Sequence, residues 1–461
     1  MPDILTKLPQ FLTELGGVLA ANCLSTGAAV LRAYATDQGP VTSYQEPAAV
    51  IWAESVTDVQ AVVKLASAYG VAVVCRGAGT GVSGGAHASD GCVVLSLERM
   101  NRILELNAAD EVAVVEPGVI NADLNAAAAD YGLMFAPDPA SYRLSTVGGN
   151  IATNAGGLRC AKYGVTRDSV LALDVVLADG SLISTGHRTF KGVAGYDLTG
   201  LFVGSEGTLG VLVAATVRLK YLPLEVRTLA VFFQDFQTAA AGVLAVGRAR
   251  IQPSIMELLD GASLLELDTR LGSDLVSRGN ALLLIQTDGL AAQLEAELIT
   301  AALSDLGGEL SNAGPEEALR LMDLRRSSRG MEGDVESSVG EDVAVPRSQL
   351  VHYIFELERM AAHHEVGLRV VAHAGDGNLH PTFWVPGTDP QSTGALAAAL
   401  NESIDVALAM GGTITGEHGV GQYKLRWLPL EQHAEVLQLQ RKIRNVFDPL
   451  GIFNPGKAMP A

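Results

Sequence analysis

The segment RGAGTGVSGG, at residues 76–85, is the densest glycine run of the chain, and it decides which fold surrounds it. It contains a G-x-G-x-x-G pattern from Gly79 to Gly84, the spacing of a Rossmann dinucleotide-binding turn. That turn requires a strand before it and a helix that begins directly after it. A strand is predicted at residues 71–75, but a short polar stretch and then a second strand, residues 92–97, follow the glycines. The Rossmann interpretation therefore fails, and a long loop between two strands remains.

Two further stretches of small residues favour a ligand-binding role for this loop. Glycines expose backbone N–H groups and allow close approach, so the loop suits a pyrophosphate, although composition alone leaves a flexible surface loop open. The second stretch, residues 145–157, is followed by Tyr163-Gly164, and the third, residues 204–211, lies next to a predicted strand. Three such turns in one domain indicate a long ligand that is wrapped by backbone.

Composition limits the classes of function. The chain has 461 residues, of which 48% are hydrophobic, and this is enough for two or three domains with a large core. Its 51 acidic and 32 basic residues give a formal charge of -19, which argues against a nucleic-acid partner because phosphate binding needs a basic surface. A small anionic substrate stays compatible with this charge, since a few local arginines can bind one carboxylate.

Cysteine usage and the N-terminus indicate a reduced compartment. Cys23, Cys75, Cys92 and Cys160 are scattered and form no C-x-x-C pair, so we expect no disulfide framework, iron–sulfur cluster or structural zinc. Residues 1–5 lack the basic and apolar regions of a secretory signal, and no apolar run approaches the ~20 residues that cross a bilayer. We expect a cytoplasmic protein that reaches a membrane only through a partner.

The periodicity of apolar residues divides the chain into parts at 1–225, 226–410 and 411–461. Short β-branched runs punctuated by glycine dominate the first part. The second part alternates strands and helices in an order typical of a ferredoxin-like α+β sheet. Its predicted strands are residues 229–233, 254–258 and 281–286, and its predicted helices are residues 236–248 and 291–306. The third part is again rich in glycine, and we expect residues 445–457 to dock back on the first part.

Histidines gather in two glycine-framed turns. HAGDGNLH, residues 373–380, joins two apolar segments through a Gly-Asp-Gly-Asn centre that reads as a hairpin, which would bring His373 and His380 together. TGEHGVG, residues 415–421, places Glu417 beside His418. Two histidines and a glutamate can form a three-ligand divalent metal site with open positions. The alternative is that the histidines of the hairpin only form hydrogen bonds and that His418 is simply packed.

Taken in order, these motifs resemble a known family. Residues 45–225 resemble the FAD-binding domain of the vanillyl-alcohol oxidase and p-cresol methylhydroxylase (PCMH) superfamily. The whole chain is similar to the D-lactate dehydrogenase and glycolate oxidase flavin-subunit branch of that superfamily. The resemblance implies an α+β fold: a two-subdomain PCMH-type FAD-binding domain, a ferredoxin-like α/β cap domain for the substrate, and a C-terminal segment that returns to the FAD domain and completes the active site.

The resemblance also implies which residues bind the cofactor. They are Arg76, Gly77, Ala78, Gly79, Thr80, Gly81, Ser83, Gly84, Pro137, Asp138, Ser145, Thr146, Gly148, Gly149, Asn150, Ala152, Asn154, Gly156, Gly157, Tyr163, Gly164, Glu206, Gly207, Gly210, Val211 and Asn454. Members with covalent FAD carry a histidine directly after the last glycine of an R-x-x-G motif in the first loop. This chain has Thr80 at that position, after Gly79, so the resemblance implies FAD that is held without a covalent bond there.

Catalytic roles follow from the same resemblance. His373, His380 and Glu417 correspond to ligands of a divalent metal, Zn or Mn, and His418 corresponds to the base. Arg325 is our candidate to clamp the substrate carboxylate, because a planar guanidinium can bind it bidentately. The alternative for Arg325 is a solvated arginine on a helix, an interpretation that we prefer for Arg326 and Arg329. Arg347 is a weaker second candidate.

The implied reaction is oxidation of a short D-2-hydroxy acid, such as D-lactate or glycolate, with hydride transfer to flavin N5. Some relatives that oxidise hydroxyglutarate have asparagine where this chain has Thr382, and lysine shortly before the D-V-x-x-P segment, where this chain has Gly340-Glu341. Both departures point away from a second carboxylate on the substrate. The open alternatives are a D-2-hydroxyglutarate-type dehydrogenase, a flavoprotein subunit without independent activity, a metal-dependent hydrolase and an enzyme of ether-lipid synthesis.

The route by which electrons leave the flavin is not defined by the sequence. Oxygen, a quinone, an electron-transfer protein and a companion iron–sulfur subunit are all compatible with the four scattered cysteines, which offer no internal cluster. The oligomeric state is open as well, a homodimer included.

Overall fold

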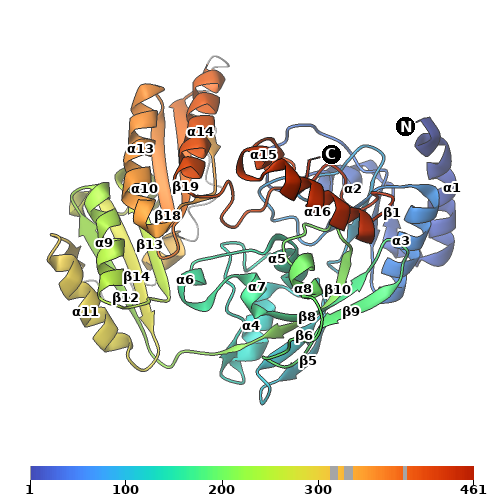
Figure 1. The fold of residues 1–461 in the computed structure, drawn as a ribbon, viewed down its shortest axis with the longest axis horizontal. Helices are drawn as coiled ribbons and strands as arrows, with labels where there is room; N and C mark the ends of the chain where they lie inside the picture. The colour runs from blue at the N-terminus through green and yellow to red at the C-terminus, as the bar shows by residue number, and fades with distance from the viewer. Residues whose placement is uncertain (1, 312–319, 326–335, 388–391, 461) are drawn as a thin grey trace. The chain divides into compact units, whose positions relative to one another are not determined.

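The computed structural model describes residues 2–311, 320–325, 336–387 and 392–460. These residues form two compact units (Figure 1). Unit 1 comprises Met1–Ala155, Val165–Leu222 and His418–Ala461, and unit 2 comprises Gly156–Gly164 and Pro223–Glu417. The division differs from the sequence-based parts mainly in residues 156–164, which belong to unit 2. Leu158 packs into the apolar core of unit 2, a long-range contact that periodicity does not reveal.

The first sheet of unit 1 frames the glycine-rich loop. Its strand order is β1 (Leu24–Ser25), β2 (Ala49–Trp52), β4 (Val93–Ser96) and β3 (Val73–Arg76). Strand β4 is parallel to both β2 and β3, so the predicted loop between two strands is confirmed at residues 77–92. Helices α1 (Pro2–Val18) and α3 (Val56–Tyr69) pack against each other, and α2 is Ala28–Ala33. The Ser55 side chain caps α3 by accepting from the Asp58 N–H.

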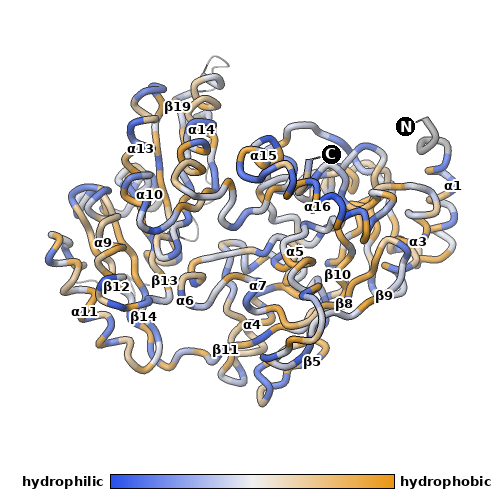
Figure 2. Tube along the Cα trace, viewed as in Figure 1, coloured by the Kyte–Doolittle hydropathy of each residue, from blue (hydrophilic) through white to orange (hydrophobic). Residues whose placement is uncertain are grey.

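The second sheet of unit 1 is antiparallel. Its order is β5 (Ile103–Asn107), β6 (Val112–Val115), β10 (Val211–Arg218), β8 (Val170–Val176) and β9 (Leu182–Gly186). Strands β8 and β10 are rich in apolar residues (Figure 2). These side chains form a core with residues of helices α4 (Asn121–Ala129), α5 (Val147–Thr153) and α8 (Leu198–Phe202). The remaining short elements are β7 (Leu133–Met134), β11 (Lys220–Tyr221) and α7 (Thr166–Ser169).

The C-terminal segment completes unit 1, as expected. It forms α15 (Leu428–Glu431) and α16 (Ala434–Phe447) and then runs beside β3, where Phe453 forms a parallel bridge with Val73. Phe453 is fully buried in the core beneath the first sheet. The prediction that residues 445–457 dock back on the first part of the chain is confirmed.

Unit 2 is built on one antiparallel sheet in the order β15 (Glu309–Leu310), β12 (Val226–Phe233), β14 (Ala281–Asp288), β13 (Ile255–Asp260), β18 (Gly367–His373), β19 (Asn378–Pro386) and β16 (Glu336–Gly340). A further short strand, β17 (Val343–Ala344), also pairs with β19. The first four strands, with helices α9 (Phe236–Arg248) and α11 (Ala292–Ser304), have the chain order of a ferredoxin-like unit, as predicted. The extension of the sheet by β18, β19 and β16 was not predicted.

Both faces of the unit 2 sheet are covered. Helix α9 contacts both α11 and α13 (Leu350–His363), and α13 also contacts α14 (Ser392–Ala409). Helix α10 (Gly261–Leu271) packs with Leu158, Leu259 and Leu321 in a separate core, and α6 (Cys160–Tyr163) contacts β13. Alternation along β13 places Glu257 on the same face as Ile255 and Leu259, which belong to this second core.

Candidate functional site

The first glycine-rich loop is shaped by close contacts that exclude side chains. A Cβ atom on Gly77 would lie 2.4 Å from Thr146 Oγ1, and one on Gly79, which has a φ of +70°, would lie 2.0 Å from Arg76 Nη2. Arg76 itself is buried: its Nη1 donates to the Thr36 carbonyl at 2.8 Å, and its guanidinium lies 5.2 Å from the Tyr34 ring centroid. The glycines of this loop therefore allow its backbone to pack closely against Thr146 and the Arg76 side chain.

The first and third small-residue turns and residues 145–155 of the second contact one another in unit 1. Gly77 abuts Thr146, which caps α5 by accepting from the Gly149 N–H at 3.1 Å. The Glu206 N–H, in the third turn, donates to the Ala152 carbonyl at 2.8 Å. Asn454 ties the C-terminal segment to two of the turns, because its Nδ2 donates to the carbonyls of Gly85 at 3.0 Å and Glu206 at 2.6 Å. These contacts hold the turns together, and backbone N–H groups in such turns could bind the pyrophosphate of a dinucleotide.

Several residues that support these turns escaped the sequence analysis. Asn121 is fully buried, and its Nδ2 donates to the Pro137 carbonyl at 3.0 Å and to Asn150 Oδ1 at 3.1 Å. Asp37 accepts from the Ala86 N–H at 3.0 Å and lies 2.9 Å from His87 Nε2, behind the first loop. In the sequence these are isolated polar residues outside any motif. Only their burial in the structure indicates that they support the glycine-rich turns. Asp138 is buried, Val211 begins β10, and Gly210 directly precedes that strand.

The last residues of the second turn belong to unit 2. A Cβ atom on Gly156 would lie 2.7 Å from Glu417 Oε2, so this glycine borders the predicted metal ligand. Tyr163 Oη donates to Asp288 Oδ2 at 2.8 Å, and Lys162 also pairs with Asp288. The expected cofactor-binding residues Gly156, Gly157, Tyr163 and Gly164 therefore group with the cap and not with the other turns.

The predicted hairpin is confirmed and brings the two histidines together. In the β18–β19 ladder His373 pairs with Asn378 and His380 pairs with Val371, so both imidazoles lie on one face of the sheet. Their ring centroids are 5.2 Å apart. Glu417 Oε1 lies 3.3 Å from Nε2 of His373 and 3.3 Å from Nε2 of His380. The three side chains offer atoms within 4.8 Å of one another, which is the spacing of a metal-ligand set.

Two buried carboxylates stand behind these side chains. Glu257 Oε1 is 2.7 Å from His373 Nδ1, and Asp342 Oδ1 is 3.9 Å from His380 Nδ1. Asp342 also accepts from the Glu417 N–H at 3.1 Å. Burial lowers the pKa of His373, but Glu257 and Glu417 outweigh it and raise that pKa to about 10. Burial raises the pKa of Glu257, but Arg325 and His373 reverse the shift, so the net direction is downward.

Arg325 is buried, with 2% of its surface exposed, and its Nε lies 2.6 Å from Glu257 Oε2. The alternative of a solvated arginine is therefore wrong for this residue. Arg326 and Arg329 lie outside the described residues. Arg347 is exposed and approaches Gly247 at the end of α9.

The turn after Glu417 is held by unit 1. Glu206 Oε1 accepts from the Val420 N–H at 2.8 Å, and Oε2 accepts from the Gly421 N–H at 2.7 Å. Burial raises the pKa of Glu206, although these two N–H groups act in the opposite direction. Glu206, expected to bind the cofactor, thus uses its carboxylate to fix the backbone that follows His418.

The two positions that bear on substrate length are neighbours in the sheet. Gly340 on β16 pairs directly with Thr382 on β19, and a Cβ atom on Gly340 would lie 3.3 Å from Thr382 Oγ1. Thr382 is two residues from His380 and therefore points to the same face of the sheet. A side chain at either position would extend beside the histidines.

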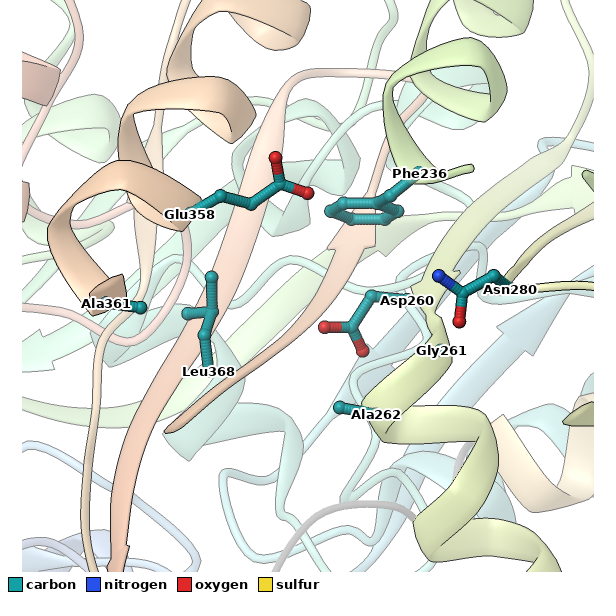
Figure 3. Close-up of a pocket in the computed structure, with 8 residues that line it drawn as sticks. All are labelled: Phe236, Asp260, Gly261, Ala262, Asn280, Glu358, Ala361 and Leu368. Atoms are coloured by element: carbon teal, nitrogen blue, oxygen red, sulfur yellow. The ribbon is translucent and has the colours of Figure 1, made fainter. Parts of the chain in front are cut away.

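A separate cavity of about 270 Å³ opens in unit 2, on the side of α9 and α13. Figure 3 shows the carboxylates of Asp260 and Glu358 and the ring of Phe236 around it. Burial raises the pKa of Asp260 to about 6, while the side chain caps α10 by accepting from the Ser263 N–H at 2.8 Å.

Among the helices that the structure describes, none is long and apolar enough to span a membrane.

Comparisons with known proteins agree with this architecture. A family model described as FAD binding domain matches residues 47–186, and one described as FAD linked oxidases, C-terminal domain, matches residues 222–458. The glycolate oxidase subunit GlcD of Bacillus subtilis is 38% identical over 430 residues, which cover 92% of this chain and 91% of that protein. The D-lactate dehydrogenase of Archaeoglobus fulgidus is 36% identical, with coverage of 87% and 89%. The D-2-hydroxyglutarate dehydrogenase of Stutzerimonas stutzeri is 31% identical, with coverage of 98% and 99%.

A solved structure confirms the expected PCMH-type fold. p-Cresol methylhydroxylase with bound substrate aligns with a TM-score of 0.81 at 18% identity, over 98% of this chain and 97% of that one. At this identity the likeness concerns the fold, whereas the family matches and the relatives above concern the chain itself. The chain belongs to the FAD-linked oxidases, in the PCMH-type flavoprotein family that includes glycolate oxidase GlcD subunits and D-lactate dehydrogenases.

Proposed function

We propose that this protein oxidises a short D-2-hydroxy acid, of the D-lactate or glycolate type, to the 2-oxo acid with FAD as the oxidant. The observation that carries the proposal is the cluster of His373, His380 and Glu417 in a chain of this flavoprotein family. Glu417 is followed directly by His418 in the sequence. Relatives named as a glycolate oxidase subunit and as a D-lactate dehydrogenase support the substrate class.

Each proposed site residue has a distinct role in the reaction. His373, His380 and Glu417 would hold a divalent cation, Zn or Mn, which supplies Lewis-acid polarisation of the substrate hydroxyl. Arg325 would bind the substrate carboxylate. His418 takes the hydroxyl proton as general base. FAD, when bound, accepts the hydride that leaves C2, so the substrate loses two electrons and two hydrogens in total.

The first glycine-rich loop in unit 1 supports non-covalent binding of FAD. Glycines at 77 and 79 let the loop pack closely against Thr146 and Arg76, and Thr80 offers no imidazole for a covalent link at that point. The reduced flavin would pass its electrons to a quinone, an electron-transfer protein or an iron–sulfur subunit. The GlcD relatives are named as subunits of a glycolate oxidase, which supports a protein partner.

A D-2-hydroxyglutarate-type activity is the second candidate, because one relative of that name aligns over 98% of this chain. The pairing of Gly340 with Thr382 favours the shorter substrate, since neither side chain carries a charge for a second carboxylate.

Anaerobic reduction of the flavin tests the proposal. The purified yellow protein is mixed with D-lactate, L-lactate, glycolate and D-2-hydroxyglutarate, and the loss of flavin absorbance is followed. We expect D-lactate or glycolate to bleach the flavin faster than the L-isomer or the dicarboxylate. A flavin that none of the hydroxy acids reduces would overturn the proposed activity, and faster reduction by D-2-hydroxyglutarate would favour the second candidate.

A further inference from the structure

Glu257 is a fully buried carboxylate on a strand that is otherwise mostly apolar. Its neighbours on β13 include Ile255, Leu258 and Leu259, all of which belong to the core. A carboxylate in such surroundings strongly destabilises the fold unless it is paired and hydrogen-bonded. The partners of Glu257 therefore decide what the residue does.

Each oxygen of Glu257 meets a different cationic or N–H-bearing group. Oε1 lies 2.7 Å from His373 Nδ1, and Oε2 lies 2.6 Å from Arg325 Nε. The sheet fixes the first contact, because Glu257 on β13 is the direct cross-strand partner of His373 on β18. A carboxylate can accept from both groups at once, whereas an amide in its place has one acceptor oxygen and would turn its NH₂ toward a donor.

We propose that Glu257 is a positioning residue that holds His373 in the ligating tautomer and joins it to Arg325, an inference that rests on the metal-assisted function proposed above. When Nδ1–H donates to Glu257, Nε2 is the ring nitrogen that faces Glu417 Oε1, 3.3 Å away, and a cation held there would take the place of a proton on Nε2. The same hydrogen bond makes the imidazole a stronger donor to a cation.

The contact with Arg325 gives Glu257 a second consequence. Arg325 compensates the buried negative charge, and in return Glu257 fixes the guanidinium on the face of the sheet that carries His373. The group that would bind the cation and the group that would bind the substrate carboxylate thus share one anchor. Loss of this anchor should weaken both cation affinity and substrate binding, whereas a residue that only supports the fold would weaken neither in the folded protein.

Zinc affinity measured on the flavin-loaded enzyme tests the role directly. Zn²⁺ is titrated in competition with a chromophoric chelator into the wild type and into Glu257→Gln, Glu257→Asp and Asp260→Asn. We expect Glu257→Gln to bind Zn²⁺ about 10- to 100-fold more weakly and to show a raised KM. Glu257→Asp retains two acceptor oxygens, so its Zn²⁺ affinity should lie between those of Glu257→Gln and the wild type. If Glu257→Gln does not fold, Glu257→Asp provides the test in its place. Asp260→Asn is the matched control, because Asp260 is a buried carboxylate on the same strand that caps α10, and it should stay within about twofold of the wild type.

Two other outcomes have distinct meanings. If the wild type binds Zn²⁺ and the Gln and Asp variants of Glu257 bind it equally well, the positioning role is wrong while the metal site stands. If the wild type binds no Zn²⁺, the metal site of the proposed function is wrong, and the role of Glu257 falls with it.

Discussion

Glu206 and Val420 are 214 positions apart in the chain, yet the Val420 N–H donates to Glu206 Oε1 at 2.8 Å. Through this bond and its neighbour at Gly421, a glycine-rich turn of the cofactor domain fixes the backbone two residues beyond His418. The backbone that follows the proposed base is therefore held by a residue that the family resemblance assigns to cofactor binding.

Glu206→Gln should lower kcat, because an amide accepts only one of the two N–H bonds and the turn that carries His418 loses its anchor. A fall of about 10- to 100-fold is expected from misplacement of a catalytic group, with a smaller change in the affinity for FAD. Steady-state kinetics and FAD titration check this. Glu116→Gln is the control, since Glu116 is also buried in unit 1 but pairs with Arg102. Wild-type kcat in the Glu206 variant would show that the turn holds its position without this carboxylate.

Replacement of His418 by alanine should leave a yellow protein with about 10²- to 10⁴-fold less activity, the usual contribution of a general base. The absorption spectrum reports the retained flavin, and substrate turnover reports the loss. Full activity in this variant would remove His418 from the mechanism.

The double variant Gly340→Lys and Thr382→Asn should shift specificity toward a dicarboxylate. Gly340 pairs with Thr382 two residues beyond His380, so an added ammonium and amide can reach a distal carboxylate. A hydrogen bond to a charged group contributes about 1.5–3 kcal/mol, which corresponds to about 10- to 100-fold in kcat/KM for D-2-hydroxyglutarate relative to D-lactate. An unchanged ratio would place the far end of the substrate elsewhere.

Asp260 should make the stability of the protein depend on pH. Its folded pKa of about 6 lies above the ordinary 3.8, so its contribution is fully present below pH 3.8 and is lost as the pH rises through 6. Asp260→Asn does not titrate, so the stability of the wild type relative to this variant should fall by about 1–2 kcal/mol between pH 5 and 7.5. Urea unfolding of both proteins at the two pH values measures this. A difference that is constant or grows with pH would contradict the raised pKa.

Local signals predicted the framework well. The failed Rossmann context at residues 76–97 correctly gave a loop between two strands, and the Gly-Asp-Gly-Asn centre at residues 375–378 correctly gave the hairpin that pairs the histidines. Both depend on neighbours in the chain, which is why a single sequence was sufficient.

Long-range partners could not be predicted in this way. Glu257 meets His373 only because β13 and β18 become adjacent in the sheet, and nothing in the stretch PSIMELLD marks its glutamate as different from a surface residue. Residues 156–164 joined unit 2 for the same reason, since Leu158 finds its apolar partners across the chain. The ligand roles of His373, His380 and Glu417 and the boundaries of the functional domains stay predictions.

The central claim is that the His373, His380 and Glu417 cluster serves flavin-linked oxidation of a D-2-hydroxy acid. The most direct measurement is the rate of anaerobic flavin bleaching by D-lactate in the protein as purified, after removal of metal by a chelator, and after addition of Zn²⁺ or Mn²⁺. We expect bleaching to slow by at least about 100-fold on metal removal, because Lewis-acid assistance is lost, and to return when the metal is restored. Bleaching at an unchanged rate in the metal-free protein would contradict the central claim.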